Sequence, residues 1–274
     1  MIDVSKKTVI YLFGIFLAFW IGFAIHRAFF YIDKYHGDYS RIVERKVIRV
    51  CGENDLFSYY SDNEGEHGFH YEMAKAFADI HKLKLEYKTE SNFQKRLKML
   101  ETGKCDFITG PLPVITELHD NLIYTENIYR SRLMLIQRKK QNNIGLIRNQ
   151  TRLSGKPVYV PEGSPYISRL KSLSSEISDS ITIRNIPVFG NEQLISLVSM
   201  RFCDFAICDE MVADSYLAKY YNIDVETPLS FNQFHAWAVK HGSNRLLDSL
   251  DMFISRYKKS PEFTRLFQKY TIKN

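Results

Sequence analysis

Catalysis by the chain's own side chains finds little support in the sequence. The serine-hydrolase motif G-x-S-x-G and the zinc-protease motif H-E-x-x-H are both absent. No His and Cys residues stand out in the sequence as a nucleophile and its base. Glu117, beside Thr116, fits a solvated turn carboxylate better than a general acid. These features favour a protein that binds a ligand without chemistry and without a cofactor or metal.

The four cysteines, at positions 51, 105, 203 and 208, also lack the C-x-x-C spacing of a zinc site. Cys203 and Cys208 flank one short strand, which spans about 16 Å. A disulfide requires Cα atoms within about 7 Å, so these two cannot bond to each other. We expect small buried thiols in the core.

Two polar positions are suited to holding a ligand. In "PEGSPY", Ser164 is a candidate N-cap and Pro165 a candidate first residue of a helix, and a helix start of this kind binds anions. The alternative is a helix cap without a ligand. Asp209 ends a predicted strand, where a carboxylate is well placed for a cation. Its alternative role is the N-cap of a helix expected over residues 209–221.

The elements that must position these residues repeat. "GKCDFITG" at 103–110 and "RFCDFAICD" at 201–209 share Cys-Asp-Phe, and each follows an amphipathic helix. We expect Ser91 with Gln94 to cap the first helix and Asn191 to cap the second. The predicted buried stripes of the two helices are Phe93, Leu97 and Leu100, and Leu194, Leu197 and Val198. Each half of the chain therefore contains the same helix–strand unit, unless the similarity arose by chance.

Strands also open both halves. "VIRVCG" (47–52) and "LKLEYKT" (83–89) flank a helix expected over 68–82, and "KPVYVP" (156–161) starts the second half. Alternating strands and helices predict parallel sheets with helices on both faces, and hence two α/β lobes. Ligands of such sheets bind outside the carboxyl ends of the strands, so we expect one cleft between the lobes.

The N-terminal segment is an uncharged, apolar run, unlike the rest of the chain. Residues 8–25 carry no charge and would form a helix about 27 Å long, close to the thickness of the hydrocarbon core. A secretory signal usually has a shorter apolar region, and the cleavage site at 22–24 is weak. We expect an uncleaved signal anchor over residues 1–30 and a connector over 31–46, with a cleaved signal as the alternative. Flanking basic residues balance and do not set the orientation.

Composition is that of an ordinary globular chain of 274 residues, 45% hydrophobic and 25% charged. The net charge of +6 favours an acidic partner such as a phosphate, a carboxylate or a membrane surface. Its basic residues are scattered, and no nucleic-acid-binding motif is present, so we expect no nucleic-acid partner.

The ordered set of motifs resembles the bacterial extracellular solute-binding proteins of family 3, the polar amino-acid type. "GFHYEMAKAFAD" is similar to the family's Gly-Phe-Asp-x-Asp-Leu-Ala helix, and the two Cys-Asp-Phe strands are similar to its Gly-x-x-Asp strands. The segment from Phe234 to Tyr270 resembles the family's closing segment, which returns to the first lobe. The chain also resembles the sensor-like N-terminal domain of membrane-bound lytic murein transglycosylase F. It stops at Asn274, so we expect no transglycosylase domain.

This resemblance implies an α/β, two-lobed periplasmic-binding-protein type II fold, which would follow the one transmembrane helix expected from residues 8–25. Lobe one would comprise residues 47–138 and the return segment 231–274, and lobe two residues 139–230. The two crossings, near residues 138–141 and 228–231, would form a hinge. Ligand binding would close the lobes, because only the closed form lets both lobes contact the ligand.

The resemblance also implies the site. In family members an Arg holds the ligand carboxylate, and the matching position in this sequence is Leu118. The resemblance implies that Gly110, Pro113 and Thr116, in the same stretch, contact the ligand. Because the clamp is missing, we expect free α-amino acids to bind weakly. The remaining implied ligand-binding residues are Tyr59 or Tyr60 as an aromatic wall, Gly163 and Ser164, and Asp209 as the acceptor of a ligand ammonium. His70 replaces the family's Asp, and we expect a surface or capping role for it.

Together these patterns predict a solute-binding or sensor protein at the inner membrane, with its C-terminal domain on the extracytoplasmic side. Its ligand would be small, polar and amine-bearing: an amino-acid derivative, a peptide or a cell-wall fragment. Expected partners are an ABC transporter permease or a cell-wall enzyme. The alternatives are an idle binding fold that acts as an interaction module, and a dehydratase-like enzyme.

Overall fold

The computed structural model describes residues 14–25, 39–115, 122–139, 145–177, 180–187 and 190–271, and it divides the chain into units 1–45 and 46–274. In the first unit, residues 14–25 and 39–45 are helical. Ile15, Phe19 and Trp20 expose more than half of their side chains. None of the helices in the described ranges is both long enough and apolar enough to cross a bilayer. Residues 8–13 of the apolar segment lie outside those ranges.

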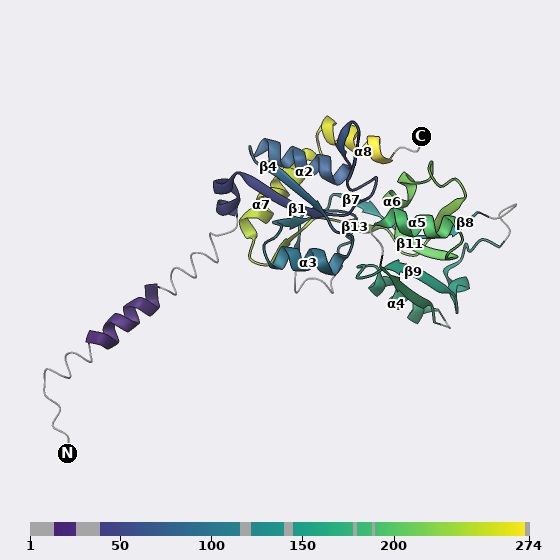
Figure 1. Ribbon diagram of the computed structural model, residues 1–274, viewed down its shortest axis with the longest axis horizontal. Helices are drawn as coiled ribbons and strands as arrows, with labels where there is room; N and C mark the ends of the chain where they lie inside the picture. The colour runs from purple at the N-terminus through teal and green to yellow at the C-terminus, as the bar shows by residue number, and fades with distance from the viewer. Residues whose placement is uncertain are drawn as a thin grey trace, which may run out of the picture. The chain divides into compact units, whose positions relative to one another are not determined.

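The second unit contains two five-stranded sheets (Figure 1). The first sheet has the order β4 (Lys84–Thr89), β1 (Val47–Gly52), β5 (Phe107–Ile108), β14 (Ala238–Lys240) and β6 (Leu122–Tyr124). The second has the order β10 (Thr182–Ile186), β9 (Pro157–Pro161), β11 (Phe205–Asp209), β8 (Leu133–Arg138) and β12 (Ile223–Pro228). In each sheet three neighbouring strands pair in parallel, as the alternating pattern predicts, and one strand, β14 in the first sheet and β8 in the second, runs antiparallel to both of its neighbours.

Each sheet and its helices form one lobe. Lobe one carries α2 (Phe69–Ile80), α3 (Phe93–Glu101), α7 (Asn244–Tyr257) and α8 (Pro261–Thr271). Lobe two carries η3 (Gln150–Leu153), α4 (Ile167–Glu176), α5 (Asn191–Ser199) and the short α6 (Glu210–Ser215). The two lobes lie side by side in Figure 1. The α/β, two-lobed architecture expected from the sequence is therefore confirmed.

A short antiparallel ribbon lies where the chain passes between the lobes. It consists of β7 (Tyr129–Ser131) and β13 (Gln233–His235), each next to a crossing. The family resemblance predicts the first crossing near residues 138–141. β8 instead pairs with β11 and β12 of lobe two, so the chain leaves lobe one before Leu133. An apolar run such as "LMLI" predicts a buried strand but not the sheet that it joins.

The repeated helix–strand unit is present in both lobes, with α3 leading to β5 and α5 leading to β11. The predicted stripes are buried, except that Leu197 is only half-buried. The caps differ from the prediction. Asn92, not Ser91, caps α3 by accepting from the Lys95 N–H at 3.1 Å, and Gly190 precedes α5, so that Asn191 lies in its first turn. Asp209 does cap α6, but that helix ends at Ser215 instead of Tyr221.

All four cysteines are buried and free. The expectations of core thiols and of no bond between Cys203 and Cys208 are confirmed. Cys51 and Cys105 pack in one apolar cluster of lobe one together with Phe93 and Leu97. Burial raises the pKa of the Cys203 and Cys208 thiols, which keeps both protonated at neutral pH.

Candidate functional site

The two lobes touch through polar side chains at the carboxyl ends of their parallel strands. Asn191, at the start of α5 in lobe two, donates its amide N–H groups to Glu53 at 2.7 Å and to Asp55 at 3.3 Å. Glu53 and Asp55 follow β1 of lobe one. The side chain of Asn191 therefore bridges the cleft where the family resemblance places the ligand.

A buried ion pair supports the lobe-one side of this contact. The Arg96 guanidinium, 1% exposed, pairs with the Glu53 carboxylate and donates to the carbonyl oxygen of Thr109 at 3.3 Å. Burial of a lone cation would be costly, so Glu53 is needed to hold Arg96 in place. Gly110 lies against this pair, because a Cβ there would be 3.3 Å from Arg96 Nη1 at a φ of +120°.

Asp55 fixes the loop after β1. Its Oδ1 accepts from the N–H groups of Phe57 at 3.0 Å and Ser58 at 2.6 Å, and its Oδ2 accepts from the Ser58 hydroxyl at 3.1 Å. Burial, followed by the neighbouring Glu53 carboxylate, raises the pKa of Asp55 to about 7, although the hydrogen bonds from Ser58 and Asn191 act in the opposite direction. Two carboxylates thus face one amide across the cleft.

Two cavities lie at this junction, one inside the cleft and one at its mouth. The inner cavity has a volume of about 20 Å³, room for about one water molecule. Its lining comes from Glu53, Ser91, Arg96, Pro161, Ser164, Pro165, Tyr166, Gly190, Asn191 and Ile207. Because only this volume remains and Asn191 is hydrogen-bonded across it to Glu53, the inner cleft is closed in this conformation.

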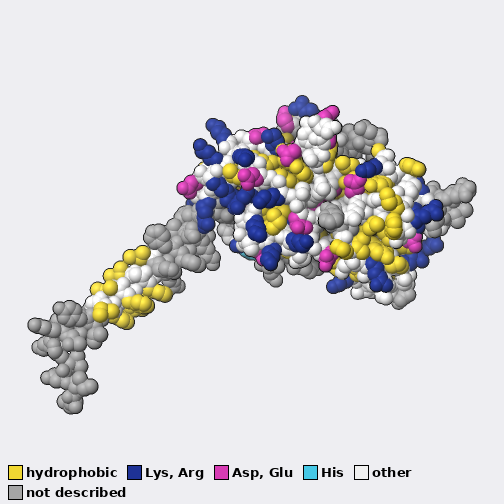
Figure 2. Space-filling view, viewed as in Figure 1, with side chains coloured by type: hydrophobic (Ala, Val, Ile, Leu, Met, Phe, Trp, Pro, Cys, Tyr) yellow, Lys and Arg dark blue, Asp and Glu magenta, His cyan; other side chains and the backbone are white. Residues whose placement is uncertain are grey.

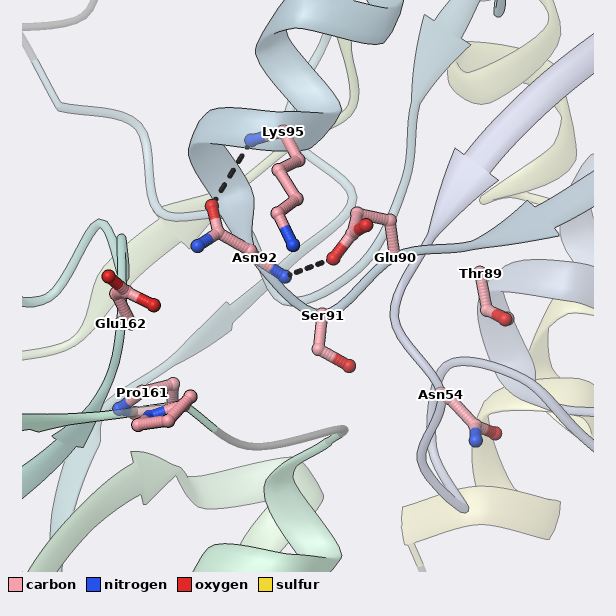
Figure 3. A pocket seen from close by; sticks show the side chains of 9 residues that line it. Asn54, Thr89, Glu90, Ser91, Asn92, Lys95, Pro161 and Glu162 are labelled. Atoms are coloured by element: carbon pink, nitrogen blue, oxygen red, sulfur yellow. Dashed lines mark hydrogen bonds between the residues drawn. The ribbon is translucent and has the colours of Figure 1, made fainter.

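The outer pocket is much larger, about 540 Å³, and both lobes contribute to it. It is lined by Asn54, Thr89, Glu90, Ser91, Asn92, Lys95, Pro161, Glu162 and Pro187. Figure 3 shows Lys95 and Glu90 on the side of α3, with Glu162 on the facing loop after β9. Lys95 and Glu162 are exposed, and neither side chain is in an ion pair within the described residues. One cation and two carboxylates therefore border the space.

Gly163 and Ser164, predicted to bind a ligand, lie where the lobes meet. A Cβ at Gly163, whose φ is +71°, would be 2.7 Å from Asn92 Oδ1, so a substitution here would strain the backbone and displace the Asn92 side chain. Ser164 borders the inner cavity, and its hydroxyl accepts from the Tyr166 N–H at 3.2 Å. The following helix, α4, begins at Ile167 and not at Pro165. The expected helix N-terminus therefore starts two residues later than predicted, behind Pro165 and Tyr166.

Asp209 is 1% exposed and borders neither cavity. Its Oδ1 accepts from the Met211 N–H at 3.0 Å, which is the predicted alternative role as an N-cap. Its Oδ2 lies 3.2 Å from His235 Nε2, without the alignment of a hydrogen bond. His235 belongs to the ribbon between the lobes and stacks on Tyr129 with ring centroids 5.1 Å apart. The acceptor predicted for a ligand ammonium thus faces a side chain of the protein itself.

The predicted aromatic wall lies outside both cavities. Tyr59 stacks on Tyr87 at 4.9 Å, and its hydroxyl donates to Glu66 at 2.8 Å. Tyr60 packs on His67 in the hairpin of β2 (Tyr60–Asp62) and β3 (Gly65–His67). Their proposed ligand role would require a different conformation.

The position of His70 in the structure differs from the role predicted for it. A surface or capping role is wrong, because His70 is fully buried. The Trp237 indole N–H donates to His70 Nδ1 at 2.9 Å, so Nε2 carries the proton and donates to the Tyr129 hydroxyl at 3.1 Å. Burial, followed by the nearby His235 and Arg96, lowers the pKa of His70 well below its usual value of 6.5. His70 is a neutral part of the core beside the ribbon.

The turn that holds the family's carboxylate clamp is described only in part. Pro113 is buried and forms a β-bridge with His235. Thr116 and Leu118 lie outside the described residues. Among the residues that the structure covers, no group of three or more His, Cys, Asp or Glu side chains could hold a metal ion.

The sequence did not indicate the contacts that close the cleft, between Asn191 and Glu53 and between Glu53 and Arg96, and it assigned Asn191 only a capping role. One signal was available for Arg96. It lies three residues after Phe93 and next to Leu97, so the helical period places it beside the buried stripe. A buried cation there requires an anion, but the sequence offers no way to choose Glu53 from the other acidic residues.

The fold and this interlobe junction define a two-lobed α/β binding protein. Residues 47–273 match the family described as bacterial extracellular solute-binding proteins, family 3. The chain belongs to that family. Over 260 residues the chain is also 30% identical to membrane-bound lytic murein transglycosylase F from Desulfosudis oleivorans. The matched region covers 92% of this chain and 54% of that protein. The chain spans about half the length of the curated relatives that it matches.

Solved structures share the fold. One is an ABC uptake transporter substrate-binding protein from Streptococcus pneumoniae with bound histidine, with a TM-score of 0.75 and 17% identity over 86% of this chain and 96% of that chain. Another is an amino acid ABC transporter substrate-binding protein from Streptococcus pneumoniae bound to L-arginine, with a TM-score of 0.73 and 21% identity over 85% of this chain and 97% of that chain. At these identities the likeness establishes the fold alone.

Proposed function

We propose that this chain is an extracytoplasmic solute-binding or sensor protein, held at the inner membrane by its N-terminal apolar segment. The observation that carries the proposal is the pocket of about 540 Å³ to which both lobes contribute. Pockets for small molecules commonly measure about 300–1,000 Å³ and lie between domains. A ligand here would contact both lobes and would stabilise their closure.

The charges around the pocket support a small polar ligand that carries an amine. Glu90 and Glu162 are suited to an ammonium group, and Lys95 is suited to a carboxylate or another anionic group. Related structures hold histidine and L-arginine, which supports an amino-acid derivative, a peptide or a cell-wall fragment. Leu118 and Pro113 replace the family's carboxylate clamp, so Lys95 would take that role. Asp209 would reach a ligand only after the lobes separate.

Family membership supports delivery of the ligand to an ABC transporter permease, and the transglycosylase relatives support an alternative role in sensing cell-wall material. No step of either role requires catalysis by this chain. N-terminal sequencing of the mature protein tests the anchor. A mature start at Ile25 would contradict a retained segment.

Thermal shift and calorimetry with amino acids, amino-acid amides, short peptides and muropeptides test the ligand proposal. A ligand at one hundred times its Kd would stabilise the folded chain by about 2.7 kcal/mol. Lys95→Met and Glu162→Gln should weaken that binding by about tenfold or more, equivalent to the loss of a charged hydrogen bond. Lys98→Met is the matched control, because Lys98 is exposed on the same helix but does not border the pocket. Equal losses in Lys98→Met and Lys95→Met would contradict the assignment.

One observation favours a second candidate, an interaction module with an idle cleft. The inner cleft is closed by Asn191 and by the Arg96–Glu53 pair, and it leaves only about 20 Å³. A protein closed without ligand would present a constant surface to a cell-wall or transport partner. If no compound in the screen changes Tm while a partner protein does, this second function replaces the first.

A further inference from the structure

The end of lobe one that lies away from the cleft is rich in lysine. The amino ends of the parallel strands β1, β4 and β5 lie there, opposite the carboxyl ends that carry the candidate site. We call this surface the basic end, and define it by five exposed lysines: Lys46, Lys82, Lys84, Lys104 and Lys240. Figure 2 shows Lys and Arg side chains gathered over this part of the molecule.

Strand register places these lysines together. Lys84 pairs with Val47, and its N–H donates to the carbonyl oxygen of Lys46 at 2.8 Å. Lys240 ends β14 and donates to the carbonyl oxygen of Glu101, the last residue of α3, at 2.9 Å. Lys104 follows α3 in the turn that leads to β5. Residues far apart in sequence therefore build one charged surface.

Few acidic side chains offset this charge. Lys84 lies 3.8 Å from Glu86, an exposed pair that screens little. Asp79, near the end of α2, pairs with Lys75, and Glu101 ends α3. A simpler explanation is that the lysines offset the partial negative charge at the C-terminal ends of α2 and α3. Two lysines would be sufficient to offset the charge at these two helix ends, so this explanation does not account for all five lysines of the basic end.

The backbone supports a role for charge at two of these positions. Lys46 and Lys82 both have a φ of +55°, and they are two of the three non-glycine residues with positive φ in the described chain. Each follows the end of a helix, where glycine or asparagine adopts this conformation at lower cost. A lysine in this backbone conformation is therefore less favourable than glycine or asparagine at both positions. A requirement for positive charge would explain why lysine is found there.

Chain connectivity indicates what the basic end would meet. Lys46 begins the second unit, and residues 26–45 join it to the apolar segment that ends at Ile25. Because residues 39–45 are helical, that joining segment reaches at most about 60 Å, and a membrane-anchored chain keeps its basic end within that distance of the bilayer. At such distances the effective concentration is high, and a weak electrostatic attraction is sufficient.

We infer that the basic end docks on anionic phospholipid headgroups and turns the cleft away from the bilayer surface. This inference rests on the proposed N-terminal anchor. Each lysine near an anionic bilayer strengthens attachment about fivefold, and the effect falls within a Debye length, which is about 10 Å at 0.1 M salt. Docking would hold lobe one against the membrane while lobe two stays free to close on a ligand.

Lysine acetylation of the full chain on vesicles, read by mass spectrometry, tests the inference. Flotation first shows whether the chain attaches to phosphatidylcholine vesicles, and to vesicles that also contain phosphatidylglycerol. We expect the basic-end lysines to react several-fold more slowly on the anionic vesicles, and high salt to abolish that protection. Lys139, Lys171 and Lys259, exposed elsewhere on the second unit, should react equally on both.

The combined variant Lys82→Glu, Lys84→Glu and Lys104→Glu should lose this protection. The matched control Lys139→Glu, Lys171→Glu and Lys259→Glu changes the net charge equally and should keep it. A chain that floats with both vesicle types but is labelled identically on them would overturn the docking inference while leaving the anchor intact. Failure to float with phosphatidylcholine vesicles would count against the anchor instead. Protection by a soluble anionic polysaccharide, but not by phosphatidylglycerol, would also overturn it.

Discussion

Replacing Arg96 by methionine is expected to destabilise the chain substantially, although Arg96 borders the candidate site and not the centre of an apolar core. The substitution removes the cation that pairs with Glu53 and the donor to the Thr109 carbonyl oxygen. Breaking a fully buried ion pair costs about 3–5 kcal/mol. The Glu53 side chain remains 15% exposed and keeps its hydrogen bond from Asn191, which favours the lower end of that range. We therefore expect a loss of about 3 kcal/mol.

Thermal unfolding measures this loss. For a domain of this size each kcal/mol lowers Tm by about 2–4 °C, so Arg96→Met should lower Tm by about 6–12 °C. Lys95→Met is the matched control: Lys95 is the preceding residue of α3 but is exposed, and a surface substitution changes stability by less than about 0.5 kcal/mol.

The double variant Glu53→Gln with Arg96→Met separates the charge effect from packing. It removes the unpaired carboxylate, so it should recover a large part of the lost Tm. A Tm for Arg96→Met within about 2 °C of the wild type would refute the buried pair, given the relation between stability and Tm. A double variant no more stable than Arg96→Met would show that packing, and not the unpaired charge of Glu53, accounts for the loss.

Three further predictions follow from the described contacts. Because burial lowers the pKa of His70 in the folded chain, the unfolded state binds a proton there more tightly, and the stability present above a pH of about 6.5 is lost as pH falls below it. Asp55, whose pKa is raised to about 7, acts in the opposite direction, so the His70 contribution is read as a difference in Tm between the wild type and His70→Gln, which should shift against the wild type from pH 7.5 towards pH 5. An unchanged slope in His70→Gln would assign the pH effect to other groups. The backbone of Gly190 is extended, and a Cβ there would lie 2.6 Å from the Asn54 carbonyl oxygen. Gly190→Ala should therefore separate the lobes and raise the radius of gyration measured by small-angle scattering. Asn191→Ala removes hydrogen bonds without a clash and should raise the radius of gyration less. Equal radii for Gly190→Ala and the wild type would contradict close contact there. The four thiols of the reduced chain are buried, so they should react slowly with a maleimide until urea exposes them. If an unreduced digest contained a peptide linking Cys203 to Cys208, the strand assignment between these two residues would be wrong.

Local patterns were sufficient for much of the fold. The stripe of Phe93, Leu97 and Leu100 predicts α3, since a period of 3.6 residues puts these side chains on one face whatever surrounds them. β1 over Val47–Gly52 matches its predicted bounds, because a β-branched run favours a strand and the glycine after it marks where the strand ends. The two Cys-Asp-Phe strands and the order of the motifs indicated two α/β lobes and the family.

Where the chain crosses between lobes, and what fills the cleft, depended on tertiary structure. The apolar run of β8 suits either sheet, and only its pairing with β11 assigns it to lobe two. The family comparison suggested a surface or capping role for His70, but Trp237, 167 positions away, supplies the donor that allows its burial. Asn191 and Glu53 lie 138 positions apart, and their hydrogen bond forms only when the two lobes meet. The sequence by itself determined which elements form, because periodicity and turn chemistry act over a few residues. Only the folded chain decided which charges meet across the cleft, because a buried charge is tolerable only where packing brings it a partner.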